Sequence, residues 1–192
     1  MTTPLKVGDL VNVHLTYDDY AALPDDGRRY QLFEGDLDVT PAPSPAHQRI
    51  SRNLQLELML HVRDQRLGAV YNAPIDVIVA DDTIVQPDLV FLRREQLGLV
   101  SARGIEGAPD LIIEILSPKT ARVDRTTKMR LYARAGVREY WIVDPDAAAV
   151  EVYALAERTF ELAATAARGG QVRSPLLPEL VLPVDAIFAD DV

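Results

Sequence analysis

The aliphatic residues of this chain recur at two spacings, which separate the expected helices from the expected strands. A helical repeat follows a serine-proline pair, with aliphatic side chains at Ile50, Leu54, Leu58 and Val62. Ser44 is a good N-cap, Pro45 suits the first helical position, and Gly68 suits a C-terminal stop. The pattern therefore predicts a long helix over residues 45–67.

Shorter elements are expected before this helix. Residues 16–23 have the pattern of a short capped helix, which ends at the turn residues 24–27. Two strand-like runs, residues 30–34 and 37–40, flank Gly35-Asp36, a typical two-residue hairpin turn. An N-terminal β-hairpin is therefore expected before the long helix.

Strand-like runs dominate the centre of the chain, at residues 69–79, 84–92 and 111–116. A second helix is expected over residues 120–135, and strands follow at 139–144 and 150–153. This order predicts an α/β (α+β) fold with a mixed central sheet flanked by helices. We expect one domain over residues 1–192, with a core at about 16–153 and a peripheral C-terminal β extension at 154–192.

Two acidic residues stand out against the strand pattern. Glu114 is surrounded by aliphatic residues in the run 111–116, where an ionised carboxylate is costly unless a partner or a metal compensates it. Asp88 follows Pro87 and precedes another apolar strand. Two acids on consecutive strands could share a hard cation, Mg²⁺ or Mn²⁺, which prefers oxygen ligands. The alternatives are a turn residue for Asp88 and a buried salt bridge for Glu114.

Charge is distributed unevenly along the chain. The formal net charge of −9 argues against a nonspecific nucleic-acid binder. In contrast, residues 117–136 carry one acid, Asp124, and six basic residues, namely Lys119, Arg122, Arg125, Lys128, Arg130 and Arg134. This segment follows the Glu114 strand, so it suits either a phosphate backbone passing the acids or an ordinary solvated helix face.

Several classes of protein are disfavoured by what the sequence lacks. It has no glycine-rich phosphate loop, no Gly-x-Ser-x-Gly motif, and no zinc spacing among His14, His47 and His61. His47 falls in the first turn of the long helix, where a solvated histidine is the default. The absence of cysteine, of a membrane-length apolar run and of an apolar leader makes the cytoplasm the expected location, with no membrane partner.

A combination of motifs resembles a known family, the Uma2-type restriction endonucleases of the PD-(D/E)xK restriction-endonuclease-like superfamily. The motifs are residues 30–35, Pro43-Ser44-Pro45-x-His47, Pro87-Asp88-Leu89, residues 114–118 and residues 131–145. The resemblance runs from about residue 16 to residue 153. It implies an αβββαβ core and metal-dependent cleavage of phosphodiester bonds, with DNA as the expected substrate.

The resemblance also implies roles for individual residues. Asp88 and Glu114 match the metal ligands, and Glu34 matches an additional early acid near the metal, although alone it reads as an exposed edge acid. The lysine that the superfamily places two residues after the second acid is Leu116 here. Lys128, on the following helix, matches the family's helical lysine, and Lys119 is the runner-up.

Two further expectations concern activity and assembly. The alternative to a nuclease is an inactive nucleic-acid-binding or assembly module that keeps the fold and holds Asp88 and Glu114 as buried polar structure. Because nucleases of this type commonly act in pairs to cut both strands, we also expect a homodimer.

Overall fold

The computed structural model describes residues 13–177 and 179–190. Its central six-stranded sheet has the order β12-β11-β10-β9-β6-β3. The strands are β3 (Gly68–Asn72), β6 (Leu89–Arg93), β9 (Leu111–Ile115), β10 (Glu139–Asp144), β11 (Ala149–Ala156) and β12 (Thr159–Ala167). Strands β9 and β10 are parallel and the other neighbours are antiparallel, so the sheet is mixed as expected.

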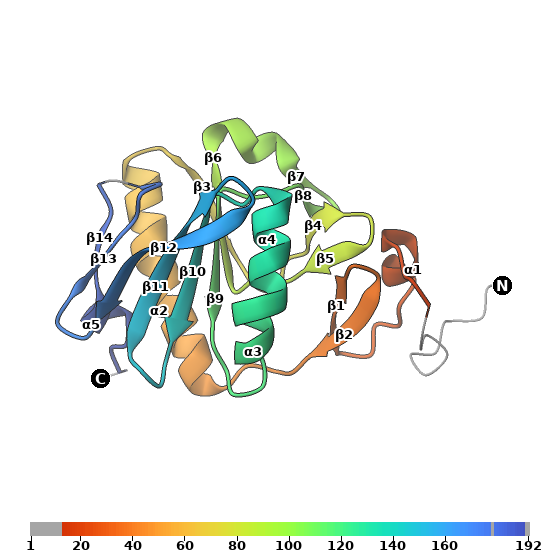
Figure 1. Ribbon diagram of the computed structural model, residues 1–192, viewed down its shortest axis with the longest axis horizontal. Helices are drawn as coiled ribbons and strands as arrows, with labels where there is room; N and C mark the ends of the chain where they lie inside the picture. Colours follow the sequence, from red (N-terminus) through yellow and green to blue (C-terminus); the bar gives the residue numbers. More distant parts are fainter. Residues whose placement is uncertain (1–12, 178, 191–192) are drawn as a thin grey trace.

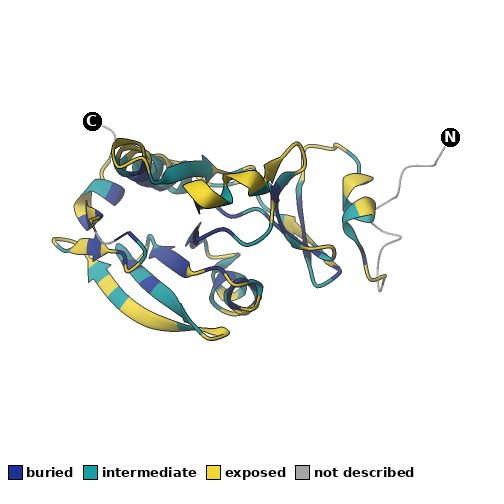
Figure 2. Cartoon of the chain, turned by 90° about the horizontal axis from the view of Figure 1, so that it is seen from above, coloured by how far each residue is buried: buried dark blue, intermediate teal, exposed yellow. Residues whose placement is uncertain are grey.

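Helices cover both faces of the central sheet (Figure 1). On one side lies α2 (Pro45–Asp64), whose buried residues Ile50, Leu54, Leu58 and Val62 are those of the expected helical repeat. On the other side, α3 (Ala121–Val123), the π-helical turn η3 (Asp124–Lys128) and α4 (Met129–Ala135) follow one another. Seen from above, buried residues lie on the strands between these helices and exposed residues face outward (Figure 2).

A second six-stranded sheet, with the order β2-β1-β5-β4-β8-β7, lies toward the N-terminal side of the molecule (Figure 1). Its strands are β1 (Arg29–Phe33), β2 (Asp36–Thr40), β4 (Val77–Ala80), β5 (Thr83–Val85), β7 (Val100–Ser101) and β8 (Gly104–Glu106). The expected hairpin is β1–β2, and α1 (Tyr17–Ala21) is the expected short helix. The 3₁₀ helix η2 (Arg94–Leu99) leads from β6 into β7. No helix in the described ranges is long and apolar enough to cross a membrane.

Two of the expected central strands are wrong in extent, because each is divided between the two sheets. The run 69–79 forms β3 in the central sheet and β4 in the second sheet, with Pro74 between them. The run 84–92 forms β5 and then β6, with Pro87 between them. Proline lacks the N–H that a strand ladder needs, so each run leaves its first sheet at the proline.

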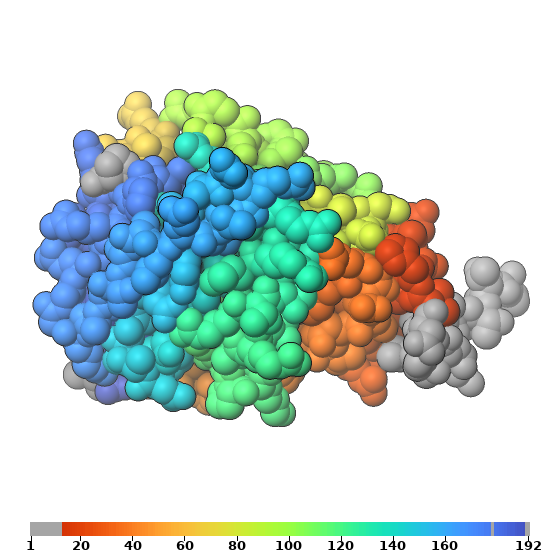
Figure 3. Space-filling model, in the orientation of Figure 1, coloured from red at the N-terminus to blue at the C-terminus, as the bar shows by residue number. Residues whose placement is uncertain are grey.

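The C-terminal segment is more than the peripheral extension that was expected. Strand β12 pairs along β11 at the edge of the central sheet, and in the space-filling view the C-terminal region packs beside α3–α4 (Figure 3). The short hairpin of β13 (Gln171–Arg173) and β14 (Val181–Pro183) and the helix α5 (Val184–Ile187) follow. Val172, Leu182 and Ile187 are buried in the same core cluster as the inner face of α2.

A buried carboxylate attaches this segment to the sheet. Glu139, at the start of β10, is 1% exposed, and its Oε1 accepts hydrogen bonds from Trp141 Nε1 and Ser174 Oγ, both at 2.6 Å. Its Oε2 accepts a hydrogen bond from the main-chain N–H of Leu176 at 2.8 Å. Burial raises the pKa of Glu139, while these three donors act in the opposite direction. The carboxylate therefore satisfies three buried donors from two segments.

Glu139→Ala should lower the free energy of unfolding by about 3 kcal/mol or more, because three buried donors would lose their acceptor. Urea denaturation followed by tryptophan fluorescence measures this change. Glu161→Ala, on the exposed side of β12, is the matched control and should change stability by less than about 0.5 kcal/mol. Equal stability of the two variants would show that Glu139 does not hold the C-terminal segment.

Candidate active site

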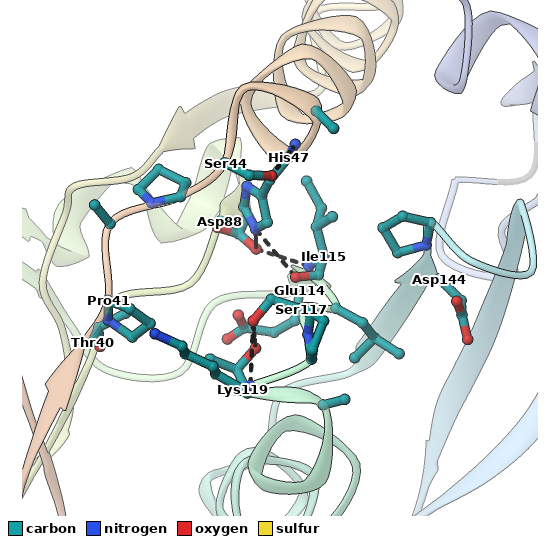
Figure 4. A pocket seen from close by; sticks show the side chains of 18 of the residues that line it. Thr40, Pro41, Ser44, His47, Asp88, Glu114, Ile115, Ser117, Lys119 and Asp144 are labelled. Atoms are coloured by element: carbon teal, nitrogen blue, oxygen red, sulfur yellow. Dashed lines mark hydrogen bonds and ion pairs between the residues drawn. The ribbon is translucent and has the colours of Figure 1, made fainter.

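A cavity of about 530 Å³ opens where the start of α2 meets the start of β6 and the end of β9 (Figure 4). Its walls include the segment that joins β2 to α2, the loop that joins β9 to α3, and the turn after β10. The charged and imidazole side chains that line it are Arg29, His47, Asp88, Glu114, Lys119, Arg125, Lys128, Asp144 and Asp146. Three of the four sequence-predicted site residues, Asp88, Glu114 and Lys128, therefore face one cavity.

Register brings the two predicted metal ligands together. Strands β6 and β9 are antiparallel with Leu89 opposite Ile113, and one step further along the same register places Asp88 opposite Glu114. The main-chain N–H of Ile115 donates a hydrogen bond to Asp88 Oδ2 at 2.8 Å. Asp88 is thus held at the end of β9, where the carboxylates of two neighbouring strands face the cavity.

His47 completes the cluster around Asp88. Its Nε2 lies 3.1 Å from Asp88 Oδ2 and 3.1 Å from the carbonyl oxygen of Ile115, and its side chain is only 15% exposed. Ser44 caps α2 by accepting a hydrogen bond from the main-chain N–H of His47, which fixes the first helical turn. The solvated position expected for His47 is therefore wrong, because the N-terminus of α2 points into the end of the sheet.

Glu114 is held from the opposite side by Lys128 and Tyr132. Lys128 Nζ lies 3.0 Å from Glu114 Oε1, and the hydroxyl of Tyr132 donates a hydrogen bond to the same oxygen at 2.7 Å. A second acid, Asp124, places its Oδ1 3.0 Å from Lys128 Nζ. Glu114, Asp124 and Lys128 are all 4% exposed or less, so one ammonium is buried between two carboxylates.

The side chains of Asp124 and Lys128 meet because they lie four residues apart, at the two ends of a π-helical turn. Asp124–Lys128 forms this turn between α3 and α4, and both of its end residues are buried. A π turn widens the helix locally and is frequent at functional sites. The expected helix over residues 120–135 is confirmed, and so is the i, i+4 ion pair of Asp124 with Lys128 that its spacing indicates. The π-helical turn and the burial of this pair beside Glu114 were not predicted from the sequence.

Burial controls the protonation of this cluster. It raises the pKa of Glu114 to about 8, and the charges of Asp124 and Asp88 add to that effect while Lys128 and Tyr132 oppose it. Burial alone would lower the pKa of Lys128, but Glu114 and Asp124 raise it well above its usual range. Lys128 is therefore a permanent cation, and Glu114 is the group of this pair that can take up a proton near neutral pH.

Glu34 lies apart from the other predicted site residues. Its carboxylate contacts Arg130 at 2.7 Å and Arg134 at 2.6 Å, both on α4, and it does not line the cavity. The predicted place of Glu34 beside the metal therefore has no support in this geometry. Glu34 instead forms surface ion pairs with the two arginines of α4.

The two lysines weighed from the sequence differ in their surroundings. Leu116, at the position of the superfamily's usual lysine, is 8% exposed and packs in the core. Lys128 supplies the cation beside Glu114 instead, as expected. Lys119 is exposed and lines both this cavity and a neighbouring one of about 270 Å³, on the loop opposite Thr40 and Pro41 (Figure 4).

Two comparisons with known proteins gave a match. Residues 17–185 match the family described as "Uma2: Putative restriction endonuclease". A crystal structure of a "putative nuclease belonging to DUF820" from Anabaena variabilis superposes with a TM-score of 0.76 at 23% sequence identity, and covers 91% of this chain and 98% of that chain. None of the curated proteins compared matches the chain.

The matched region is most of the chain, so this protein belongs to the Uma2 family. The likeness to the solved structure shows the fold, a mixed α+β arrangement. The αβββαβ order inferred from the resemblance is confirmed in outline, with the central strands divided as described above.

Glu114→Gln should weaken the pH dependence of stability. Because the pKa of Glu114 is higher in the folded chain than in the unfolded chain, the native state binds more protons between pH 5 and 8. The free energy of unfolding should therefore fall as pH rises through this window, by at most about 1.4 kcal/mol per pH unit from this residue. In Glu114→Gln the fall should be shallower.

Urea titrations at pH 5, 6.5 and 8 measure this slope. Glu161→Gln is the matched control, since this exposed side chain of β12 should leave the slope unchanged. An unaltered slope in Glu114→Gln would mean that Glu114 does not retain a proton in the native state.

Proposed function

We propose that this protein is a metal-dependent endonuclease that hydrolyses phosphodiester bonds in DNA. The observation that carries the proposal is the meeting of two carboxylates from neighbouring strands, Asp88 and Glu114, in one cavity beside the buried Lys128. Family membership and fold support a nuclease, and the site supplies the groups that phosphodiester hydrolysis needs.

The residues present fit a divalent ion such as Mg²⁺ or Mn²⁺. Asp88 Oδ2 and the carbonyl oxygen of Ile115 each lie 3.1 Å from His47 Nε2, so two oxygen donors lie close together at the cavity. Within residues 13–177 and 179–190, no three acidic or histidine side chains form a ready-made cluster. Glu114 contacts Lys128 and Tyr132 through Oε1, which leaves Oε2 as the oxygen that would turn toward an ion.

A bound ion would polarise the phosphate and lower the pKa of a water molecule. The chain's own groups prepare the site for this chemistry. Lys128 neutralises charge close to Glu114 and can orient a nucleophile or a phosphate oxygen. Asp124 and Tyr132 hold Lys128 and Glu114 in place from inside the fold, and they keep the site rigid without facing the substrate themselves.

The surroundings of the cavity suit a nucleic-acid backbone. Among the described residues, Lys119 forms no ion pair and is open to solvent at the cavity wall. Arg125, in contrast, is held by Glu151 at 2.7 Å and by Asp144 at 3.4 Å. We assign Lys119 to phosphate binding and Lys128 to the reacting centre. The homodimer and the cytoplasmic location stay predictions.

A second candidate function follows from the burial and mutual pairing of Glu114, Asp124 and Lys128. Both Glu114 and Lys128 are nearly inaccessible, and each already has a charged partner. A module that binds nucleic acid without cutting it would need such a pair only for stability. Metal binding and cleavage distinguish this function from the preferred one.

Asp88→Asn and Glu114→Gln should each reduce Mn²⁺-dependent cleavage by at least about 100-fold, because each removes one charged ligand of the ion. Supercoiled plasmid and short RNAs, incubated with Mn²⁺ or with a chelator, provide the assay. Isothermal titration with Mn²⁺ should lose its heat in the same variants, while Glu161→Gln should keep both the heat and the cleavage. Cleavage that persists in both site variants would disprove the assignment.

Lys119→Ala should raise KM for a DNA substrate several-fold and change kcat little, because Lys119 meets the backbone outside the reacting centre. The effect should grow at low salt, where a phosphate contact contributes most. Steady-state kinetics at 50 and 200 mM salt test this separation. A large fall in kcat with unchanged KM would instead make Lys119 the catalytic lysine.

A further inference from the structure

The position of His47 has no explanation in the proposed roles of Asp88, Glu114 and Lys128. Its ring enters the cavity from the start of α2 (Figure 4), and the helical segment that carries Lys128 covers the other face of the sheet (Figure 1). It is mostly buried, at 15% side-chain exposure, and its Nε2 faces two oxygen atoms at once. At these distances one Nε2–H is shared between two acceptor oxygens, which hold the imidazole nitrogen beside Asp88 and the end of β9.

The distances around Nε2 resemble one corner of a coordination shell. In an octahedron with bonds of about 2.1 Å, neighbouring ligand atoms are separated by about 3.0 Å. Nε2 lies 3.1 Å from Asp88 Oδ2 and 3.1 Å from the Ile115 carbonyl oxygen. Once the ion displaces the shared proton, Nε2 could therefore lie next to each of these two oxygens around a single ion.

The backbone makes this spacing reproducible. The capping contact from the main-chain N–H of His47 to Ser44 Oγ sets the first turn of α2. Asp88 Oδ2 is tied to the main-chain N–H of Ile115 at 2.8 Å, next to the carbonyl that faces His47. The three donor atoms thus come from three elements: His47 Nε2 from α2, Asp88 Oδ2 from the start of β6, and the Ile115 carbonyl oxygen from the end of β9.

We infer that His47 is a third protein ligand of the ion, and that its nitrogen makes the site select a first-row transition ion, with Mn²⁺ as the probe, over Mg²⁺. This inference rests on the proposed function, because it concerns the ion that Asp88 and Glu114 would hold. Mg²⁺ favours oxygen ligands and water, whereas imidazole nitrogen binds transition ions more strongly along the Irving–Williams order. One imidazole among oxygen donors therefore shifts the balance away from Mg²⁺.

The spectroscopic test uses wild-type protein loaded with Mn²⁺. Pulsed electron paramagnetic resonance should show coupling of the Mn²⁺ spin to a nitrogen nucleus, and this coupling should change when the protein is labelled with ¹⁵N-histidine. In His47→Gln, where the amide oxygen can reach the same point, Mn²⁺ should stay bound and the nitrogen coupling should vanish. His61→Gln, about four turns further along α2 and outside the cavity, is the matched control and should keep the coupling.

Affinity provides the second readout. Calorimetric titration should give a ratio of Mg²⁺ to Mn²⁺ dissociation constants that falls at least about tenfold in His47→Gln and stays unchanged in His61→Gln, with circular dichroism confirming that both variants fold. Bound Mn²⁺ without nitrogen coupling in the wild-type protein, or an unchanged ratio in His47→Gln, would overturn the role of His47 and leave the proposed nuclease intact. A wild-type protein that binds no Mn²⁺ would overturn the proposed function and this inference together.

Discussion

The ammonium of Lys128, buried between Glu114 and Asp124, is the interaction on which the rest of the structure depends. It joins the central strand β9 to the helical face made by α3, η3 and α4, at contacts of 3.0 Å to each carboxylate. Neither acid could remain charged at this depth without a cation, and the cation could not remain without the acids. The same ion pairs therefore fix the helical segment on the sheet and keep the Glu114 carboxylate in the cavity.

The cavity forms where two kinds of positioning meet. Glu114 is held on one face of the sheet by Lys128, from the π-helical turn. On the other face, the main-chain N–H of Ile115 holds Asp88, and the capped start of α2 positions His47. Rigid elements fix donor atoms more precisely than loops do. Lys119, the cation assigned to substrate phosphate, lies instead on the loop that joins β9 to α3, where adjustment to a bound strand is possible.

Sequence patterns predicted much of this arrangement for physical reasons that can be traced. The repeat of Ile50 to Val62 predicted α2 because one face of that helix is buried, and the isolated charge of Glu114 predicted a compensated site. The division of two strands between sheets was missed, although Pro74 and Pro87 mark it, because periodicity does not reveal which sheet a strand joins. His47, Asp124 and Tyr132 were missed as site residues because their roles depend on contacts between distant elements. Glu34 was placed beside the metal by resemblance alone, and tertiary ion pairs with α4 hold it elsewhere.

The attachment of the C-terminal segment through Glu139 has a consequence for the order of events during synthesis. The hydrophobic layer beneath α2 includes Val184, Ile187 and Phe188, so this layer is complete only when the chain up to residue 188 has been made. The acids of β6 and β9 emerge much earlier, while the layer behind them is incomplete. The residues that line the cavity all lie between Arg29 and Asp146, so the C-terminal segment supports the cavity indirectly, through the hydrophobic layer that it shares with α2.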